Sequence, residues 1–246
     1  MKFYILCKNE SANIRKCIES LLSCGYDVAV LDSGSVDGTQ AIVQQYPVEL
    51  VIYQYTTHCN AYNEITTSSQ GGYCGILDAD MEMTRLLAGE ISTANKIDVL
   101  IAPIEMYVDG IRLEKGNLCP PKPIVFKTGK AYFESVGHGE RLIPGLKTVI
   151  AKAMLPHNDL KPYLSYLGTQ VRYADNFIVR SKDNQLTWRD RLRLKSPLLI
   201  LITPIYSLLV KGGIFKKAGW LYALDRLIAE AIMFRSSISE RIKQEK

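Results

Sequence analysis

Short apolar runs alternate with helical patterns along the first eighty residues. Four runs have the length and composition of strands that are buried on both faces: residues 3–7, 28–31, 48–53 and 73–77. Between them, apolar residues at helical spacing predict helices that begin near Ser11 and cover roughly 39–45 and 61–69. This alternation predicts an α/β fold, in which a mostly parallel sheet has right-handed crossovers and helices on its faces.

The pattern changes after residue 98. Short runs at 99–103, 105–108, 112–113 and 124–126 lie between Gly and Pro turns and predict antiparallel strands, and a helix is expected over roughly 160–180. We therefore predict one domain over residues 1–185, made of two halves at 1–98 and 99–185. Residues 186–246 form a separate helical region.

Composition narrows the class of protein. The chain has 246 residues, of which 47% are hydrophobic and 22% charged, which is typical of a globular protein. None of the six cysteines forms a CxxC pair, so zinc and dithiol motifs are not expected. The absence of a P-loop, a GxGxxG motif and a GxSxG elbow argues against an NTPase, an NAD enzyme and an α/β-hydrolase. A start without a secretory pattern favours a reducing, cytoplasmic location.

An acidic triplet, Asp78-Ala79-Asp80, follows the fourth predicted strand. Functional groups in parallel sheets gather at the carboxyl ends of the strands. Two carboxylates at positions i and i+2 can face one hard cation, with a diphosphate on its other side. The alternative is a solvated turn or a helix N-cap.

Polar residues also follow the first two predicted strands. Asn9 and Glu10 come after the first, and Asp32 and Asp37 lie in the loop after the second. For Asp32 we favour contact with a ribose or a uracil-type ring. For Asp37, capping of the second helix is as good an interpretation as ligand contact, and Ser11 is expected to cap the first helix.

Two later segments offer a general base. Glu140 ends a Gly-His-Gly-Glu sequence and is the first candidate to take a proton from an acceptor hydroxyl, although it could be a surface charge. Asp159 is its rival. His157, two residues earlier, could be a third metal ligand or a phosphate contact, or simply structural.

At this point the residues resemble a known family. The run ILCKNESANIRKCIESLLSCGYDVAVLDSGSVDGT, followed some forty residues later by LDAD, is similar to the inverting family 2 glycosyltransferases of the GT-A fold. Three later pieces are similar to the bacterial lipopolysaccharide and exopolysaccharide branch of that family: FKTGKAYFESVGHGERL, LPHNDLKPYLSYLGTQVRYAD and KGGIFKKAGWLYALDRLIAEAI.

The resemblance implies a nucleotide-sugar donor, with a UDP-sugar as the first expectation, a glycan or lipid-linked acceptor, and Mn²⁺ or Mg²⁺. Nucleic acid is not an expected partner. Asp80, and more weakly Asp78, would hold the metal and the diphosphate. The nucleotide pocket would be lined by Asn9, Glu10 and Asp32, with Asp37 close by.

The chain differs from these relatives in the residues before one helix and in those around the late glutamate. Relatives often carry an Arg-Asn pair before the helix that precedes LDAD, whereas this chain has Cys59-Asn60. An expected positive group is therefore missing, and Asn60 remains as a donor-side candidate. The late glutamate stands in Gly-His-Gly-Glu instead of Glu-Asp or His-Glu, so the choice of base between Glu140 and Asp159 stays open.

The C-terminal region predicts contact with a membrane surface. Residues 197–210 form an apolar run that contains Pro204 and is shorter than the ~20 residues that a spanning helix needs. Cations flank the run, and Trp220 and Tyr222 follow it in a second helix expected at 218–234. Such a segment suits the interface of an anionic membrane, at the inner face of the plasma membrane. The alternatives are a buried helical hairpin and a dimer interface.

Two other functions remain as alternatives. A sugar nucleotidyltransferase on the same kind of sheet would need a glycine-rich loop after the first strand, and Lys8-Asn9-Glu10-Ser11 contains no glycine. A non-catalytic, membrane-docking GT-A-like module would not need the acidic triplet.

Overall fold

The computed structural model describes residues 1–69, 72–94, 96–136, 139–182 and 196–244. The chain forms two compact units. The first contains residues 1–110, 119–134 and 141–160, and the second contains residues 111–118, 135–140 and 161–246.

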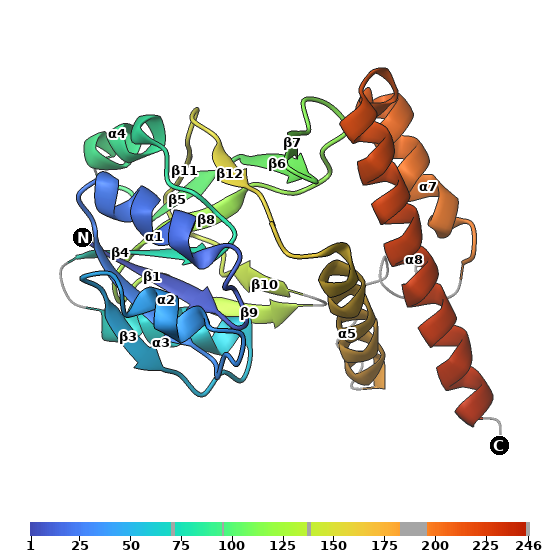
Figure 1. The fold of residues 1–246 in the computed structure, drawn as a ribbon, viewed down its shortest axis with the longest axis horizontal. Coiled ribbons are helices and arrows are strands. Elements are labelled where there is room, and N and C mark those ends of the chain that lie inside the picture. The colour runs from blue at the N-terminus through green and yellow to red at the C-terminus, as the bar shows by residue number, and fades with distance from the viewer. Residues whose placement is uncertain (70–71, 95, 137–138, 183–195, 245–246) are drawn as a thin grey trace. The chain divides into compact units, whose positions relative to one another are not determined.

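A seven-stranded sheet forms the centre of the first unit, in the order β11-β5-β8-β4-β1-β2-β3 (Figure 1). β1 pairs in parallel with β2 and β4, and β2 pairs in parallel with β3, as the sequence predicts. β8 runs antiparallel between β4 and β5, and β11 is parallel to β5. The strands are Lys2–Cys7 (β1), Asp27–Asp32 (β2), Glu49–Ile52 (β3), Tyr73–Asp78 (β4), Val99–Ala102 (β5), Lys122–Lys127 (β8) and Thr148–Ile150 (β11).

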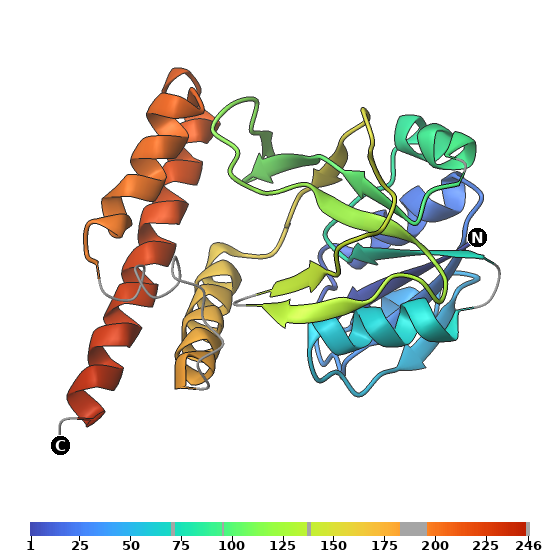
Figure 2. The ribbon, with the colours of Figure 1, turned by 180° about the vertical axis from the view of Figure 1, so that it is seen from behind.

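Helices cover both faces of this sheet. α1 (Ile14–Ser23) and α2 (Thr39–Val43) lie in front of it in Figure 1, and α3 (His58–Ser68) lies in front in the reverse view of Figure 2. α4 (Arg85–Thr93) was not predicted, because Leu87 and Ile91 are its only buried residues and give little periodicity.

The wholly apolar runs are explained by burial on both faces. Phe3 and Ile5 of β1 pack in one core with α1, whereas the next residue, Leu6, packs in the other core with α3. Gly75 of β4 is needed for this packing, because a Cβ there would lie 2.2 Å from the Phe3 ring. The sheet is therefore held rigidly at the strand ends where the polar residues gather.

Five further strands are short. β6 (Ile104–Val108) pairs in parallel with β12 (Leu155–His157), a strand that was not predicted because Pro156 and His157 lack strand propensity. The antiparallel prediction is confirmed for β5 and β8. The others are β7 (Ile111–Arg112), β9 (Phe133–Val136) and β10 (Gly139–Leu142), of which β9 and β10 form a two-stranded sheet.

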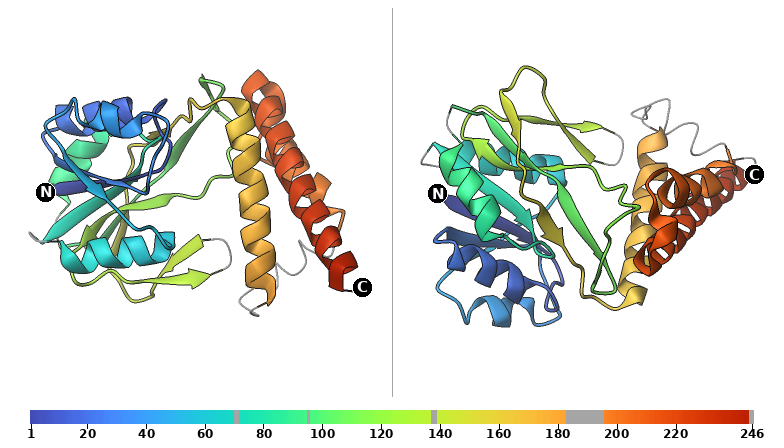
Figure 3. Two further views of the ribbon diagram at one scale, coloured as in Figure 1. Left: turned by 60° about the horizontal axis from the view of Figure 1, so that its bottom comes forward. Right: turned by 90° about the horizontal axis from the view of Figure 1, so that it is seen from above.

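Helices dominate the second unit. α8 (Lys217–Gln244) packs against α5 (Tyr163–Lys182) and α7 (Leu199–Ile205), as the views of Figure 3 show. Pro204 does not end the helix, because α7 continues through a π-helical turn, η1 (Tyr206–Val210), before the short η2 (Gly213–Phe215). The sequence placed α5 in the first domain, but its Phe177 packs with Met233 of α8. None of the described helices is long and apolar enough to cross a membrane.

Candidate functional site

The acidic triplet stands at the carboxyl end of β4, where a later segment of the chain joins it. Asp78 is the last residue of the strand, and Asp80 lies in the turn that follows. Met81 forms an isolated antiparallel bridge with His157, and the Asn158 amide donates to the Asp80 carbonyl oxygen at 2.9 Å. Backbone pairing thus brings the 155–159 segment to the triplet.

Asp80 and His157 form a direct contact. The distance from His157 Nε2 to Asp80 Oδ2 is 3.0 Å. Burial disfavours the charged imidazole, but the hydrogen bond and charge of Asp80 outweigh this effect and raise the pKa of His157. The structure therefore brings together two of the three predicted metal-site residues.

Asp78 has a partner that the sequence did not reveal. Its Oδ2 forms an ion pair with the Nζ of Lys122 at the start of β8. Burial opposes the charged ammonium, but the charge of Asp78 outweighs it and raises the pKa of Lys122. Only the strand register could have identified this pair, because the two residues are 44 positions apart.

A buried amide links the first strand's loop to the later segment. Asn13 Nδ2 donates to Glu10 Oε2 and to Asp159 Oδ1, each at 2.8 Å, and Asn13 Oδ1 accepts from the Leu160 amide at 2.8 Å. Glu10 and Asp159 therefore lie side by side. The sequence missed Asn13, which is the N-cap residue of α1, so the expectation that Ser11 caps this helix is wrong.

Asp32 and Asp37 order the loop after β2. Asp32 is fully buried and accepts hydrogen bonds from the Ser35 amide at 3.0 Å and from Gln40 Nε2 at 2.6 Å. Asp37 accepts from the Ser11 amide at 2.9 Å and the Thr39 amide at 3.1 Å. Desolvation raises the pKa of Asp37, but these bonds outweigh it and lower the pKa to about 2. Their contact with a ligand stays a prediction.

Asn9 and Asn60 are exposed, and each is held by a hydrogen bond of its side chain. Asn9 has φ of 57°, and its Oδ1 accepts from the Val36 amide at 2.9 Å, which ties the loops after β1 and β2 together. Asn60, in the first turn of α3, donates to Thr56 Oγ1 at 2.9 Å. Glu140 is in β10, but its side chain lies outside the described residues.

A divalent metal ion fits the residues at Asp80. Asp80 Oδ2 and His157 Nε2 lie 3.0 Å apart, and carboxylate oxygen and imidazole nitrogen are both ligands of Mn²⁺-type ions. Asp78 Oδ1 is buried and has no hydrogen-bond partner in the described part of the chain. No set of three His, Cys, Asp or Glu residues there could hold a metal alone. This is expected where phosphates and water complete the shell.

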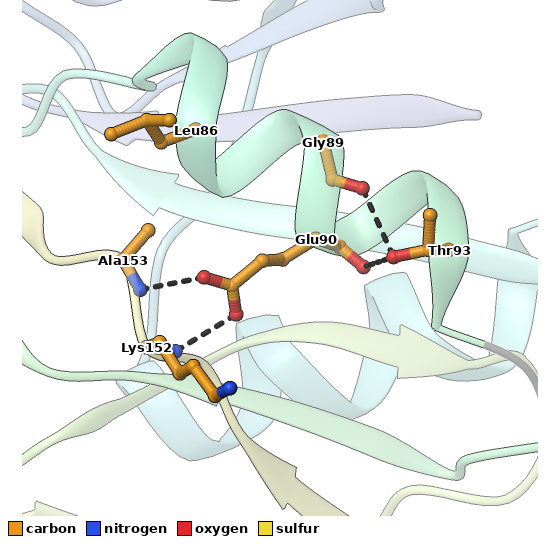
Figure 4. Close-up of a pocket in the computed structure, with 6 residues that line it drawn as sticks. All are labelled: Leu86, Gly89, Glu90, Thr93, Lys152 and Ala153. Atoms are coloured by element: carbon orange, nitrogen blue, oxygen red, sulfur yellow. Dashed lines mark hydrogen bonds between the residues drawn. The ribbon is translucent and has the colours of Figure 1, made fainter.

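The larger hollow of the first unit lies elsewhere and shows no comparable chemistry. It has a volume of about 450 Å³ and lies between α4 and the loop after β11. Figure 4 shows that Glu90 is used there to bind backbone, since its carboxylate accepts from the amides of Lys152 and Ala153 at 2.8 and 2.7 Å. A smaller hollow beside the triplet is lined in part by Asn13, Asp80 and Asn158. We therefore place the candidate site at the triplet.

Comparison with known proteins decides the family of this segment. Residues 3–119 match the model of "Glycosyl transferase family 2". These residues form a glycosyl transferase family 2 domain. The domain covers β1 to the loop before β8, and so includes the triplet, Asn13 and the loop of Asp32.

One curated relative is similar to part of the chain. The lipopolysaccharide core biosynthesis glycosyltransferase LpsC of Rhizobium meliloti (strain 1021) is 33% identical over 89 residues, which cover 34% of this chain and 33% of that protein. The chain thus matches about a third of the length of this relative.

Two solved structures are similar to the chain beyond the matched segment. The mannosyltransferase PcManGT from Pyrobaculum calidifontis, in complex with GDP-Man and Mn²⁺, is 16% identical with a TM-score of 0.52, over 95% of this chain and 86% of that one. S. aureus TarS 1–349 in complex with UDP-GlcNAc is 15% identical with a TM-score of 0.49, over 98% and 91% of the chains. The mannosyltransferase confirms the predicted GT-A fold, with a mostly parallel sheet flanked by helices.

Proposed function

We propose that this chain is an inverting, metal-assisted glycosyltransferase that moves a sugar from a nucleotide-sugar donor to a glycan or lipid-linked acceptor. The observation that carries the proposal is the contact of His157 with Asp80, beside Asp78 at the end of β4; both carboxylates lie in the segment that matches the family 2 model. The donor diphosphate would lie at this group, whose carboxylate and imidazole would hold a divalent ion that also binds phosphate.

Each residue of the site has its own role in the proposed transfer. Asp80 and His157 would hold Mn²⁺ or Mg²⁺, which would supply positive charge to the departing nucleoside diphosphate. Asn9, Asp32 and the loop that Asp37 orders form the nucleoside side of the pocket. Glu10 and Asn60 complete the predicted donor contacts. Fixed dipoles and charges of this kind stabilise the transition state without reorganisation.

Inversion requires one carboxylate to accept the proton of the attacking acceptor hydroxyl. Glu140 and Asp159 are the two candidates. The position of Asp159 beside Glu10, fixed by Asn13, supports it as a base near the triplet. The variants Glu140→Gln and Asp159→Asn distinguish the two candidates. Only the variant that lacks the true base loses the dependence of the transfer rate on an ionised carboxylate.

A lipid-linked acceptor is supported by the relative's role in lipopolysaccharide core biosynthesis and by one surface of the second unit. Leu209, Val210, Phe215 and Trp220 are exposed large apolar side chains around η1 and η2, and Phe215 is 77% exposed. We call these four residues the apolar tip. Large apolar side chains that are exposed close together in the sequence support an interaction surface.

The backbone under the apolar tip is rigid. A Cβ on Gly219 would lie 2.1 Å from the Gly213 carbonyl oxygen, so only glycine permits this close approach. Buried Ser207 donates to the Gly116 carbonyl oxygen at 2.6 Å. This close packing fixes the backbone on either side of Phe215, and the ring is exposed although its burial would stabilise the fold.

Positive charge surrounds the apolar tip. Lys211, Lys216 and Lys217 are exposed, and the ammonium of Lys115 lies 5.8 Å from the centroid of the Phe215 ring. Apolar side chains among lysines suit the interface of an anionic lipid surface, which we take as the partner of the tip. The cations predicted at 189–195 lie outside the described residues. The proposed location is therefore the inner face of the plasma membrane.

Co-sedimentation tests this partner. The chain is expected to bind vesicles that contain phosphatidylglycerol and to be released by 0.5 M salt, which is roughly the condition that screens charge beyond 4–5 Å. Equal binding to neutral phosphatidylcholine vesicles, or to neither, would refute the lipid assignment.

A thermal-shift screen tests the transfer function. UDP-, GDP-, dTDP- and CMP-sugars are added with and without Mn²⁺. A donor that binds the folded state raises the unfolding temperature by mass action, and we expect one nucleotide class to do so only with the metal. If no nucleotide sugar shifts the transition, the chain is not a glycosyltransferase of this kind.

A further inference from the structure

We propose that Lys122 contacts the diphosphate of the donor and stabilises the negative charge that develops on it as the sugar leaves. This inference rests on the proposed transfer function and assigns Lys122 a direct part in it. It also supplies the positive group that the sequence lacks at Cys59-Asn60.

Lys122 is fixed beside the triplet by the sheet. It begins β8, pairs with Ala102 of β5 across the sheet and contacts Asp78 of β4 on the other side. Its side chain is 17% exposed, so it is mostly but not completely enclosed. A lysine held on a central strand cannot swing away into solvent, as one in a loop could.

The ammonium has capacity for a ligand. An alkylammonium has three N–H donors, and the single hydrogen bond of Lys122 to a side chain in the described part of the chain is that to Asp78 Oδ2. Phosphate oxygens are suitable acceptors for the remaining donors. Lys122 is also close enough to Asp80 and His157 to interact with their charges, which places it at the same edge as the candidate metal ligands.

The charge balance of the reaction explains why a further cation is useful. When the bond between the anomeric carbon and the diphosphate oxygen breaks, its electron pair stays on that oxygen. The acceptor oxygen forms the new bond to the carbon, and its proton goes to the carboxylate base. The diphosphate therefore gains one negative charge beside two carboxylates, Asp78 and Asp80. The positive charge of Lys122 lowers the energy of this state more than that of the bound donor.

Binding of phosphate compounds tests the proposal. Isothermal titration of inorganic pyrophosphate, UDP, GDP, UMP and GMP is done with Mn²⁺ and again with EDTA. Lys122→Met is expected to weaken diphosphate and pyrophosphate binding roughly 10- to 100-fold, which corresponds to the loss of charge-assisted hydrogen bonds. Monophosphate binding changes by less than about threefold. Lys122→Arg keeps most of the affinity, because it retains charge and donors.

Two control variants separate contact from folding. Lys127→Met changes a half-buried lysine on the same strand and is expected to bind like the wild type. Lys122→Met alone leaves the Asp78 charge without its partner, and this could unfold the chain. The double variant Asp78→Asn/Lys122→Met removes both charges together, and the proposal predicts that its diphosphate affinity stays low. Wild-type affinity in the double variant means that Lys122 only neutralises Asp78, which overturns the proposal.

The remaining outcomes distinguish the inference from the function. If the wild type binds a nucleoside diphosphate and Lys122→Met binds it equally well, the inference is wrong and the transfer function stands. If pyrophosphate binds through Lys122 but no nucleotide or nucleotide sugar binds, the phosphate contact stands and the transfer function is wrong. If the wild type binds none of the probes, both are wrong.

Discussion

The triplet site and the apolar tip differ in which side chains are buried and which are exposed. At the site, Asp78, Asp80 and Asn13 are drawn inward and paired, although burial of polar groups costs free energy unless they are hydrogen-bonded. At the tip, Phe215 and Val210 are held outward, although burial would stabilise them. Both arrangements reduce the stability of the fold, and packing elsewhere offsets the loss. Buried polar groups at the site indicate a charged ligand, and exposed apolar groups at the tip indicate an apolar surface as partner.

Asp80→Asn is expected to have the largest effect in this comparison. The amide cannot carry the negative charge that the metal and His157 require, so release of nucleoside diphosphate from the donor should fall about 100- to 1000-fold. Coupled detection of the released nucleotide measures this loss, while the unfolding temperature changes little.

Asp27→Asn is the matched control, since Asp27 is exposed at the opposite end of β2. A loss of activity in this control as large as that in Asp80→Asn would mean that the carboxyl edge of the sheet has no special part in the reaction.

Gly219→Ala is expected to disturb the tip next most strongly. The added Cβ meets the Gly213 carbonyl oxygen at 2.1 Å and must displace backbone, at a cost of about 3 kcal/mol in the free energy of unfolding. Urea unfolding measures it. Gly89→Ala in α4 is the control, because nothing lies within 4 Å of a Cβ there. It should stabilise the chain by up to about 1 kcal/mol. Equal effects of the two substitutions would contradict a tightly packed tip.

The two regions also differ in how far the sequence predicted them. Asp80 and His157 were predicted as site residues from short sequence patterns and from the resemblance. The pairing of Lys122 with Asp78 and the hydrogen bonds of Asn13 were not predicted, because they depend on the register between distant segments. The sequence predicted the four parallel strands because burial on both faces leaves unbroken apolar runs. It missed α4 because that helix buries few residues.

Phe215→Ser sharpens the comparison at the tip itself. Loss of one inserted aromatic ring is expected to weaken binding to phosphatidylglycerol vesicles about tenfold, and donor binding should not change. Leu86→Ser is a close control, since Leu86 is 78% exposed and Phe215 is 77% exposed, yet Leu86 lies on α4 of the first unit. Co-sedimentation that weakens equally for both variants would indicate general surface hydrophobicity and no defined tip.

Asp37→Asn is expected to have the smallest effect and to depend on pH. Because folding lowers the pKa of Asp37 from its usual value of 3.8 to about 2, its ionised form stabilises the fold above pH 4. That stabilisation is lost as the pH falls through 2. At pH 7 the variant should unfold about 1 kcal/mol more easily than the wild type, by analogy with lost helix caps. The difference measured in urea should shrink between pH 4 and pH 2, and a difference that grows in acid would contradict this role.

The most direct measurement is the position of Mn²⁺ in a crystal of the chain grown with the nucleoside diphosphate found in the screen. Anomalous scattering at the manganese edge locates the ion without reference to the protein. The account predicts a peak roughly 2 Å from Asp80 and from a diphosphate oxygen, with His157 in contact. Bound nucleotide with the ion at another carboxylate, or with no ion at all, would contradict the assignment of the triplet as the metal and diphosphate site.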